Sequence, residues 1–454
     1  MGLSSSNGKP QGRAIVTYSR SWQALAAIRS LGRRGVEVIA ADEYSVTPGK
    51  LSRYSVDSFQ YPSPVEDPDG FLAELEQAVR RYKTDGPLVL MAIHRETYLI
   101  AAARQRFEPD AIVPLADKAK FEQVQNKGRL AEYARRQGIT VPRTWVPKNG
   151  EHIVSAADAV RYPAFLKLPE SASGVGIVKV NDRQELIATY RAMVEEFHLH
   201  GSRRPIVQEM IEGDDYCVTG LWDRGELKIA MTYRNVLSYP REQGPGAVRE
   251  TIAAPKLEAL AAELLGGLGW HGMAQVDYRW TGNDEDPAYL LEVNPRFFGG
   301  LYQAIESGVD YPYLLFQLAT GRPLALPEAI DYGVRTEAPV ISLLATLSEL
   351  GEHESKLDEL EHAWDDAKRQ LDAGHAGKAL RTILAGLQDS VDVEGRLEHV
   401  RRVLEDNADN VGVLFRVDDP LPVLGLVYPL AVFMRHGKLS KHLLAGGSAE
   451  QAGG

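Results

Sequence analysis

Three polar side chains late in the chain, Glu292, Asn294 and Arg296, are spaced two residues apart. They follow an apolar run and precede residues 297–300, a pattern typical of a strand that runs into a loop. Because side chains alternate along a strand, all three point to the same face. Carboxylate and amide oxygens suit Mg²⁺, and a planar guanidinium can hold a phosphate. Taken alone, so short a motif is more typical of a solvent-facing strand edge, so the prediction of a metal and phosphate site depends on the residues upstream.

Two further charged residues lie in strand-like segments upstream. Asp277, within residues 273–278, could supply a carboxylate from a strand next to Glu292. Lys167 lies among apolar residues, where a lysine must find a partner or reach water. The loop of small residues that follows, 171–176, can cover a polyphosphate with its backbone N–H groups. It can equally be a hairpin turn that requires glycine, and both interpretations stay open.

The residue pattern also predicts the elements that position these side chains. Residues 118–137 are typical of one charged helix, which ends at Gly138. The expected strands lie at residues 163–168, 206–209, 218–222 and 227–233, followed by an amphipathic helix at 256–267. The acidic turn at 212–215 could bind a ribose or could be a solvated turn.

The segment from Arg13 to Asp117 alternates short apolar strands with amphipathic helices. This alternation predicts a parallel sheet covered on both faces. The first strand runs into residues 17–21 without a Gly-x-Gly-x-x-Gly sequence, so we place no dinucleotide cofactor there. Arg20, His94 and Glu96 lie near the predicted carboxyl edge of the sheet and could line a substrate site, although a lone histidine is more often structural.

The composition of the 454 residues is that of a soluble protein with two or three domains. The net charge of -11 disfavours non-specific binding to nucleic acid or anionic lipid. The single cysteine, Cys217, rules out an intrachain disulfide, suits a reducing, cytoplasmic location and is expected to be a buried structural thiol. The longest apolar stretch, residues 420–434, is too short for stable membrane insertion, and residues 1–12 lack a signal-peptide core and are expected to be disordered.

A lysine at a helix start, a lysine before a Gly-containing loop, a strand with a hinge, Asp277 and Glu-x-Asn-x-Arg follow one another in this order. In this order they resemble the ATP-grasp fold of the carboxylate–amine ligases, over roughly half of the chain. The resemblance implies an α/β domain at 13–117 that precedes the grasp, and an α+β ATP-grasp domain at 118–322 with a lid at about 140–205. Residues 323–454 are then a mainly helical region with a disordered tail.

The resemblance also implies roles for individual residues. ATP would be bound by Lys127 (Lys118 being the weaker register), Lys167, the loop residues Ser171, Ser173, Gly174 and Gly176, the backbone of Glu209 and Ile211, and the ribose-binding Asp215. Two Mg²⁺ ions, for which Mn²⁺ could substitute, would be held by Asp277, Glu292 and Asn294. Arg296 would steady the transferred phosphoryl group, and Arg234 and Arg249 would hold the substrate carboxylate or the acyl phosphate.

The function implied is ATP-dependent ligation. A small carboxylate becomes an acyl phosphate, and an amine, expected to be an amino acid, then attacks it to give an amide, ADP and phosphate. The implied partners are therefore small molecules, with no nucleic acid, and a homodimer is an expectation from the resemblance. Two alternatives stay open: a non-catalytic nucleotide-binding protein on the same fold, and a carboxylase- or kinase-type variant. The absence of an evident biotin-carrier segment weakens the carboxylase interpretation.

Overall fold

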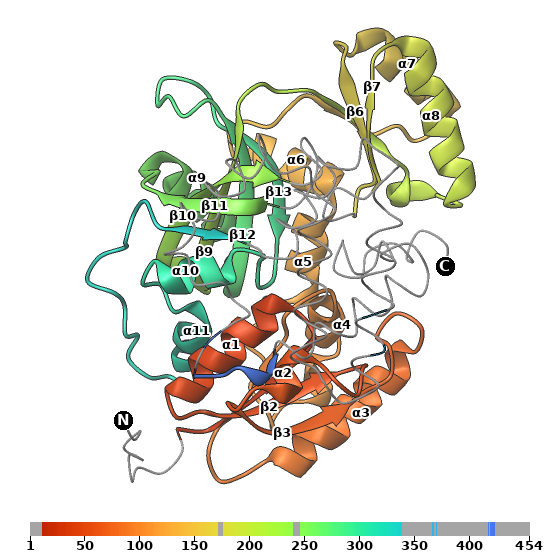
Figure 1. The fold of residues 1–454 in the computed structure, drawn as a ribbon. Coiled ribbons are helices and arrows are strands. Elements are labelled where there is room, and N and C mark those ends of the chain that lie inside the picture. The colour runs from red at the N-terminus through yellow and green to blue at the C-terminus, as the bar shows by residue number, and fades with distance from the viewer. Residues whose placement is uncertain are drawn as a thin grey trace.

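The computed structural model of this chain describes residues 11–170, 176–238 and 246–337, together with positions 366, 369, 416 and 418–422. Across these ranges the chain forms two four-stranded sheets and one six-stranded sheet, with helices packed against them (Figure 1). The predicted succession of an α/β domain and an α+β domain is confirmed by these sheets. The helices expected at 340–406 and 423–434, and the disordered ends, fall almost entirely outside the described residues.

The N-terminal sheet has four parallel strands in the order β3-β2-β1-β4. The strands are β1 (Arg13–Val16), β2 (Glu37–Asp42), β3 (Ser55–Gln60) and β4 (Leu88–Met91). The helices are α1 (Trp22–Arg33), α2 (Pro48–Leu51), α3 (Pro68–Tyr82), α4 (Glu96–Ala102) and the 3-10 turn η1 (Arg104–Arg106). Nearly every residue of β1, β2 and β4 is buried, as expected of parallel strands covered on both faces. The strand predicted at 111–113 is only an isolated bridge between Val89 and Ile112.

The helix predicted at 118–137 is in fact two helices, α5 (Lys118–Gln125) and α6 (Lys127–Arg136). The break is at Asn126, whose backbone is extended and whose Oδ1 accepts hydrogen bonds from the backbone N–H of Gly128 and Arg129. This N-cap satisfies donors that a helix start would leave without partners. The break also buries Lys127, which is only 5% exposed, at the first position of α6.

A small antiparallel sheet, in the order β5-β8-β6-β7, forms the predicted lid. Its strands are β5 (Thr144–Trp145), β6 (Ala164–Lys167), β7 (Ile177–Val180) and β8 (Ile206–Glu209). Its helices are α7 (Gly150–Ala159), α8 (Arg183–Glu196) and the 3-10 turn η2 (Gly201–Arg203). Ile153, Leu166 and Tyr190 belong to a buried cluster that is separate from the rest of the core. In Figure 1 the lid lies at the opposite end of the molecule from the N-terminal sheet.

The central sheet is antiparallel, in the order β13-β12-β9-β10-β11-β14. Its strands are β9 (Asp214–Asp223), β10 (Glu226–Ser238), β11 (Gly246–Ile252), β12 (Gly272–Trp280), β13 (Tyr289–Asn294) and β14 (Arg335–Glu337). Its helices are α9 (Pro255–Gly267), α10 (Leu301–Glu306) and α11 (Tyr311–Ala319). One face packs Val276 and Tyr278 with the α9 residue Leu257, and the other packs Cys217 and Tyr233 with the α11 residue Leu314. Cys217 is buried, as predicted.

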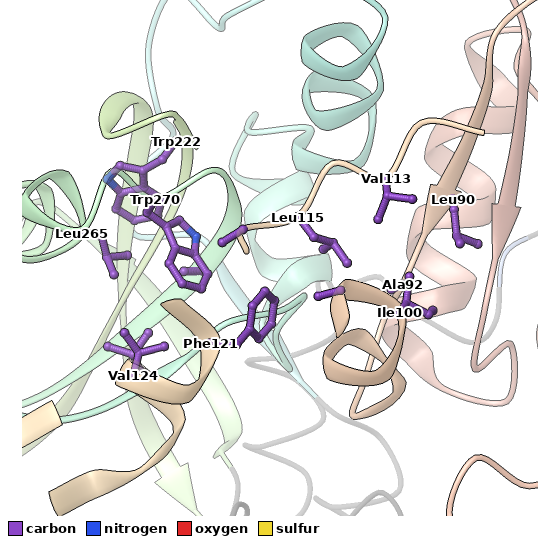
Figure 2. Close-up of a cluster of buried hydrophobic side chains, with 14 of the residues drawn as sticks. Leu90, Ala92, Ile100, Val113, Leu115, Phe121, Val124, Trp222, Leu265 and Trp270 are labelled. Atoms are coloured by element: carbon purple, nitrogen blue, oxygen red, sulfur yellow. The ribbon is translucent and has the colours of Figure 1, made fainter. Parts of the chain in front are cut away.

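The core that contains Tyr278 continues from the N-terminal sheet to the central sheet. Figure 2 shows the bridge: Leu90 and Ile100 lie at one end, Trp222 and Trp270 at the other, and Phe121 of α5 between them. The rings of Phe121 and Trp270 are 5.3 Å apart. Because the apolar contacts are continuous across α5, the two sheets pack together rather than being joined by a linker. None of the helices in the described ranges is both long and apolar enough to cross a bilayer.

A short turn from the C-terminal region contacts the N-terminal domain. Asp419 is 1% exposed and accepts hydrogen bonds from Arg29 Nε at 2.8 Å, Ser52 Oγ at 2.7 Å and the backbone N–H of Arg53 at 2.9 Å. Arg416, bridged to Asp419, forms an ion pair with Glu306 of α10 at 3.3 Å. The turn therefore links α1 and α2 to the central domain.

Candidate active site

The predicted metal ligands meet on one face of the central sheet. Asp277 of β12 and Glu292 of β13 are directly opposite each other in the strand register. Asn294, two residues on, donates from Nδ2 to Asp277 Oδ2 at 3.0 Å and to Glu292 Oε1 at 3.2 Å. Opposed residues of an antiparallel pair lie close together, so the register by itself brings two carboxylates to one point.

The two carboxylates have different electrostatic surroundings. Burial and the charge of Glu292 raise the pKa of Asp277 well above its usual value. Burial alone would also raise the pKa of Glu292, but the charge and hydrogen bond of Lys127, the charge of Lys167 and the Asn294 amide outweigh it and lower that pKa. The pair therefore has more negative charge than its surroundings neutralise, which favours an added cation.

Both predicted nucleotide lysines lie beside these carboxylates. Lys127 Nζ is 3.0 Å from Glu292 Oε2. Lys167 Nζ donates to Gln208 Oε1 at 2.7 Å, and burial together with the charge of Lys127 lowers the pKa of Lys167 to about 8. Sequence reasoning missed Gln208, although a glutamine between Val207 and Glu209 on an otherwise apolar strand was a visible signal.

Arg296 lies next to the metal ligands and is oriented by the backbone and by Asn294. Its guanidinium donates to Asn294 Oδ1 at 3.3 Å and to the Phe297 carbonyl at 3.1 Å. Burial lowers its pKa, against the opposing charges of Glu292, Glu96 and Asp277, but an arginine remains charged at neutral pH. Within the described part of the chain no carboxylate lies within ion-pair distance of it.

Arg249 and Arg234, which the sequence pattern treated alike, lie on opposite faces. Arg249 is 7% exposed and lies over the Tyr233 ring, and its Nε has no hydrogen-bond partner. Arg234 is paired in register with Tyr216, on the other face, and binds Glu250 at 2.6 and 2.8 Å. The prediction that both arginines hold the substrate is therefore corrected: the structure brings only Arg249 to the face of the metal ligands.

A hydrogen-bond chain that the sequence did not reveal connects Arg249 to Asp277. The hydroxyl of Tyr233, beneath Arg249, donates to Gln275 Oε1 at 2.8 Å. Gln275 Nε2 in turn donates to Asp277 Oδ1 at 2.6 Å. This chain sets the orientation of the carboxylate from the side opposite Asn294.

The hinge residues have several of their polar groups already engaged. The backbone N–H of Glu209 donates to the Arg143 carbonyl at 3.0 Å, and the Ile211 carbonyl accepts from Arg279 Nε at 3.3 Å. Asp215 forms an ion pair with Arg279 at 2.7 Å. The adenine and ribose roles of these residues stay predictions.

Of the phosphate-loop residues, Ser171, Ser173 and Gly174 lie outside the described residues. Gly176 closes the β6–β7 hairpin with φ +69°, and a Cβ there would lie 2.4 Å from the Leu168 side chain. Its carbonyl accepts from the Leu168 N–H at 2.9 Å. At Gly176 the turn itself requires glycine, which supports the hairpin interpretation for that position.

Glu96, a candidate for the substrate site, is engaged within the N-terminal domain. It is 2% exposed, and its Oε1 accepts from Thr17 Oγ1 at 2.6 Å and from the backbone N–H of Ile93 and His94 at 3.2 and 3.0 Å. These contacts give Glu96 a structural role at the start of α4.

Solved structures with the same fold share most of this chain. One is the biotin carboxylase domain of the Hydrogenobacter thermophilus 2-oxoglutarate carboxylase, a dimer in complex with MgADP, ADP and bicarbonate, with 17% identity, 72% of this chain and 73% of that chain covered, and a TM-score of 0.59. Another is an L-amino acid ligase from Bacillus licheniformis, with 18% identity, 70% and 76% covered, and a TM-score of 0.55. The fold and the ordered motifs make this chain a member of the ATP-grasp superfamily.

Within the superfamily, residues 201–338 match the family described as ATP-grasp in the biosynthetic pathway with Ter operon. The mitochondrial acetyl-CoA carboxylase of Saccharomyces cerevisiae is 26% identical over 180 residues, which are 38% of this chain and 8% of that protein. The D-alanine–D-alanine ligase of Natranaerobius thermophilus is 28% identical over 218 residues, 42% of this chain and 58% of that protein. The chain thus spans less than two thirds of either relative.

Proposed function

We propose that this protein is an ATP- and Mg²⁺-dependent ligase that activates a small carboxylate as an acyl phosphate and joins it to an amine. One observation carries the proposal: Asp277 and Glu292 oppose each other on the sheet face that also bears the buried Arg249, with Lys127 3.0 Å from Glu292. Carboxylates bordered by several cations suit a reaction between two anions, a triphosphate and an acid. The similarity to D-alanine–D-alanine ligase and to L-amino acid ligase supports the same class of reaction.

The residues present fit Mg²⁺ by ligand type. Mg²⁺ in nucleotide enzymes takes one or two carboxylates and completes its shell with water and phosphate oxygens. Asp277 and Glu292 supply the two carboxylates, and the described residues contain no cluster of three or more His, Cys, Asp or Glu that could hold an ion without a nucleotide. Asn294 directs its nitrogen at both carboxylates, so its amide must rotate for its oxygen to become a ligand. Bound Mg²⁺ would supply positive charge that offsets the triphosphate and the acid.

Three cations have distinct parts in the proposed reaction. Lys167, held by Gln208, and Lys127 attract the phosphates of ATP. Arg296, already oriented by Asn294 and a backbone carbonyl, stabilises charge on the phosphoryl group as an oxygen of the acid forms a bond to the γ-phosphorus and ADP leaves. Arg249 binds the acid, because its buried Nε otherwise has no hydrogen-bond partner. The amine then attacks the acyl carbon and phosphate leaves, giving the amide.

The test is a screen for ADP release from MgATP with acids and amines supplied singly and together. The proposal expects ADP, phosphate and amide in equal amounts, and only when one acid and one amine are both present. An Arg296→Ala variant, matched with Arg234→Ala on the other face, shows whether the release comes from this site. The assay is best followed with separate detection of ADP, phosphate and amide.

The same screen separates the alternatives. ADP release with bicarbonate and a nitrogen nucleophile, giving a carbamate, would favour a carboxylase-type variant. Accumulation of an acyl phosphate without an amine would favour a kinase-type variant. Tight binding of MgADP without turnover on any pair would favour a nucleotide-binding protein and contradict the proposed ligase.

A further inference from the structure

The carboxyl edge of the N-terminal sheet meets the end of β13. Tyr18, after β1, and Ile93, after β4, share one buried apolar cluster with Phe297 and Phe298, which directly follow Arg296. His94 and Arg95 therefore lie at the same junction as Arg296, although about two hundred residues separate them along the chain. The charge of Arg296 also acts on both His94 and Arg95.

The junction is built around a rigid stack of side chains. The rings of Tyr18 and His94 are 4.5 Å apart and 10° from parallel, and the Arg20 guanidinium lies 4.2 Å from the centre of the Tyr18 ring. Arg20 is neutralised by Asp42 at 3.3 Å and by Glu43. Tyr18 has φ +54°, a backbone conformation that a bulky residue rarely adopts and that is concentrated at ligand sites.

Arg95 differs from Arg20 in having no acidic partner. It is partly buried, and among the described residues no ion pair and no side-chain hydrogen bond reaches it. The nearest acid in sequence, Glu96, is engaged with Thr17 and with two backbone N–H groups and forms no ion pair with Arg95 or Arg296. Two arginines that face each other without an acid form a binding site for an anion.

We propose that Arg95 is a specificity-determining residue that, beside Arg296, binds an anionic group of a substrate other than the reacting carboxylate. The substrate class is then an acid or an amine that carries a second carboxylate or a phosphate. This inference rests on the proposed ligase function for its substrate roles. The reacting carboxylate is assigned to Arg249 on the central sheet, so Arg95 on the N-terminal domain is left for a different group of the substrates.

The experiment compares matched substrates that differ by one anionic group. Acids are supplied as butyrate, succinate and 3-phosphonopropionate, and amines as ethylamine and glycine, each with MgATP. Wild-type protein is expected to use a pair that contains an extra anion at least tenfold better than the pair that lacks it. Which pair responds distinguishes an anion on the acid from one on the amine, and a carboxylate from a phosphate.

Arg95→Ala is expected to raise the KM for that anionic substrate at least tenfold and to leave the KM for ATP unchanged, with partial rescue in Arg95→Lys. Arg81→Ala, which removes an exposed arginine of the same domain, is the control and should change neither constant. A merely structural role of Arg95 would change both KM values or the thermal midpoint together. Equal use of mono- and dianionic pairs, or an Arg95→Ala variant with unchanged KM values, would overturn the inference.

A binding readout keeps the two proposals separate. Calorimetry with MgADP-loaded protein measures the affinity for succinate and for 3-phosphonopropionate without turnover. Loss of that affinity in Arg95→Ala, combined with no ligation of any pair, would support the anion site and contradict the ligase. Ligation that occurs with no dependence on Arg95 would do the reverse.

Discussion

The N-terminal sheet and the central sheet present polar residues in different ways. In the parallel N-terminal sheet every residue of β4 is buried, and the residues that can meet a ligand, such as His94 and Arg95, lie beyond the strand end. In the antiparallel central sheet they lie along one face, as with Glu292 and Asn294 of β13. A parallel sheet covered by helices on both sides can bind only at its carboxyl edge, whereas an antiparallel strand keeps one face for packing and one for chemistry.

The same difference separates two buried carboxylates. Glu96, at the edge of the N-terminal sheet, accepts its hydrogen bonds from Thr17 and nearby backbone groups. Glu292, on the face of the central sheet, has charged neighbours, Lys127 at 3.0 Å and Asp277 directly opposite. Partners of the first kind stabilise a fold, and partners of the second kind leave charge available for a ligand. The predictions below test this division.

The largest expected effect is that of Arg296→Ala. Removing a preorganised positive group from the transferred phosphoryl is expected to lower turnover about 100- to 1,000-fold, with little change in the unfolding free energy. Steady-state kinetics with the acid and amine found in the screen measures it. Near-normal turnover would remove the end of β13 from the catalytic site and break the comparison on the central-sheet side.

Glu96→Ala tests the N-terminal side. It leaves the Thr17 hydroxyl and two buried N–H groups without their acceptor, so the unfolding free energy is expected to fall by about 1–3 kcal/mol. Urea denaturation measures the loss, and MgADP affinity should stay the same. Glu66→Ala, at an exposed position, is the control and should change stability by less than about 0.5 kcal/mol. An intact fold with lost MgADP affinity would show that Glu96 acts in the site.

Lys167 provides a pH-dependent test of the central site. Because its pKa is lowered to about 8 by burial and by Lys127, Lys167 is charged below that pH and loses its charge above it. If only the charged form binds phosphate, ADP affinity should fall about tenfold between pH 7 and pH 9. Lys167→Met should bind ADP weakly and with a flat pH profile over this range. A wild-type profile that is equally flat would contradict a phosphate-binding role for Lys167.

The smallest expected effect is that of Arg234→Ala. Its side chain is 41% exposed and its ion pair with Glu250 lies on the face away from the carboxylates, so the loss of stability should stay below about 1 kcal/mol. Turnover should match the wild-type value. A large fall in turnover would show that the two faces of the central sheet do not divide structural from catalytic roles.

Much of the site could be predicted because its signals are local. The two-residue spacing of Glu292, Asn294 and Arg296 places them on one face whatever the strand neighbours are, and Lys167 within an apolar run had to be a partnered lysine. Other parts could not be predicted, because they depend on partners far away in the chain. The break at Asn126 that buries Lys127 next to Glu292 lies within a charged run that is equally typical of one continuous helix.

By itself, the sequence determined the succession of an α/β domain and an α+β domain, the alternation of the β13 side chains and the residue types suited to phosphate and Mg²⁺. Only the tertiary structure decided that Arg249 faces the carboxylates while Arg234 faces away, and that Arg95 of the first domain meets Arg296 of the second. The physical reason is that the two faces of an isolated strand are equivalent. Strand register and the packing of one sheet against another select the face, and those contacts join residues that the order of the chain leaves apart.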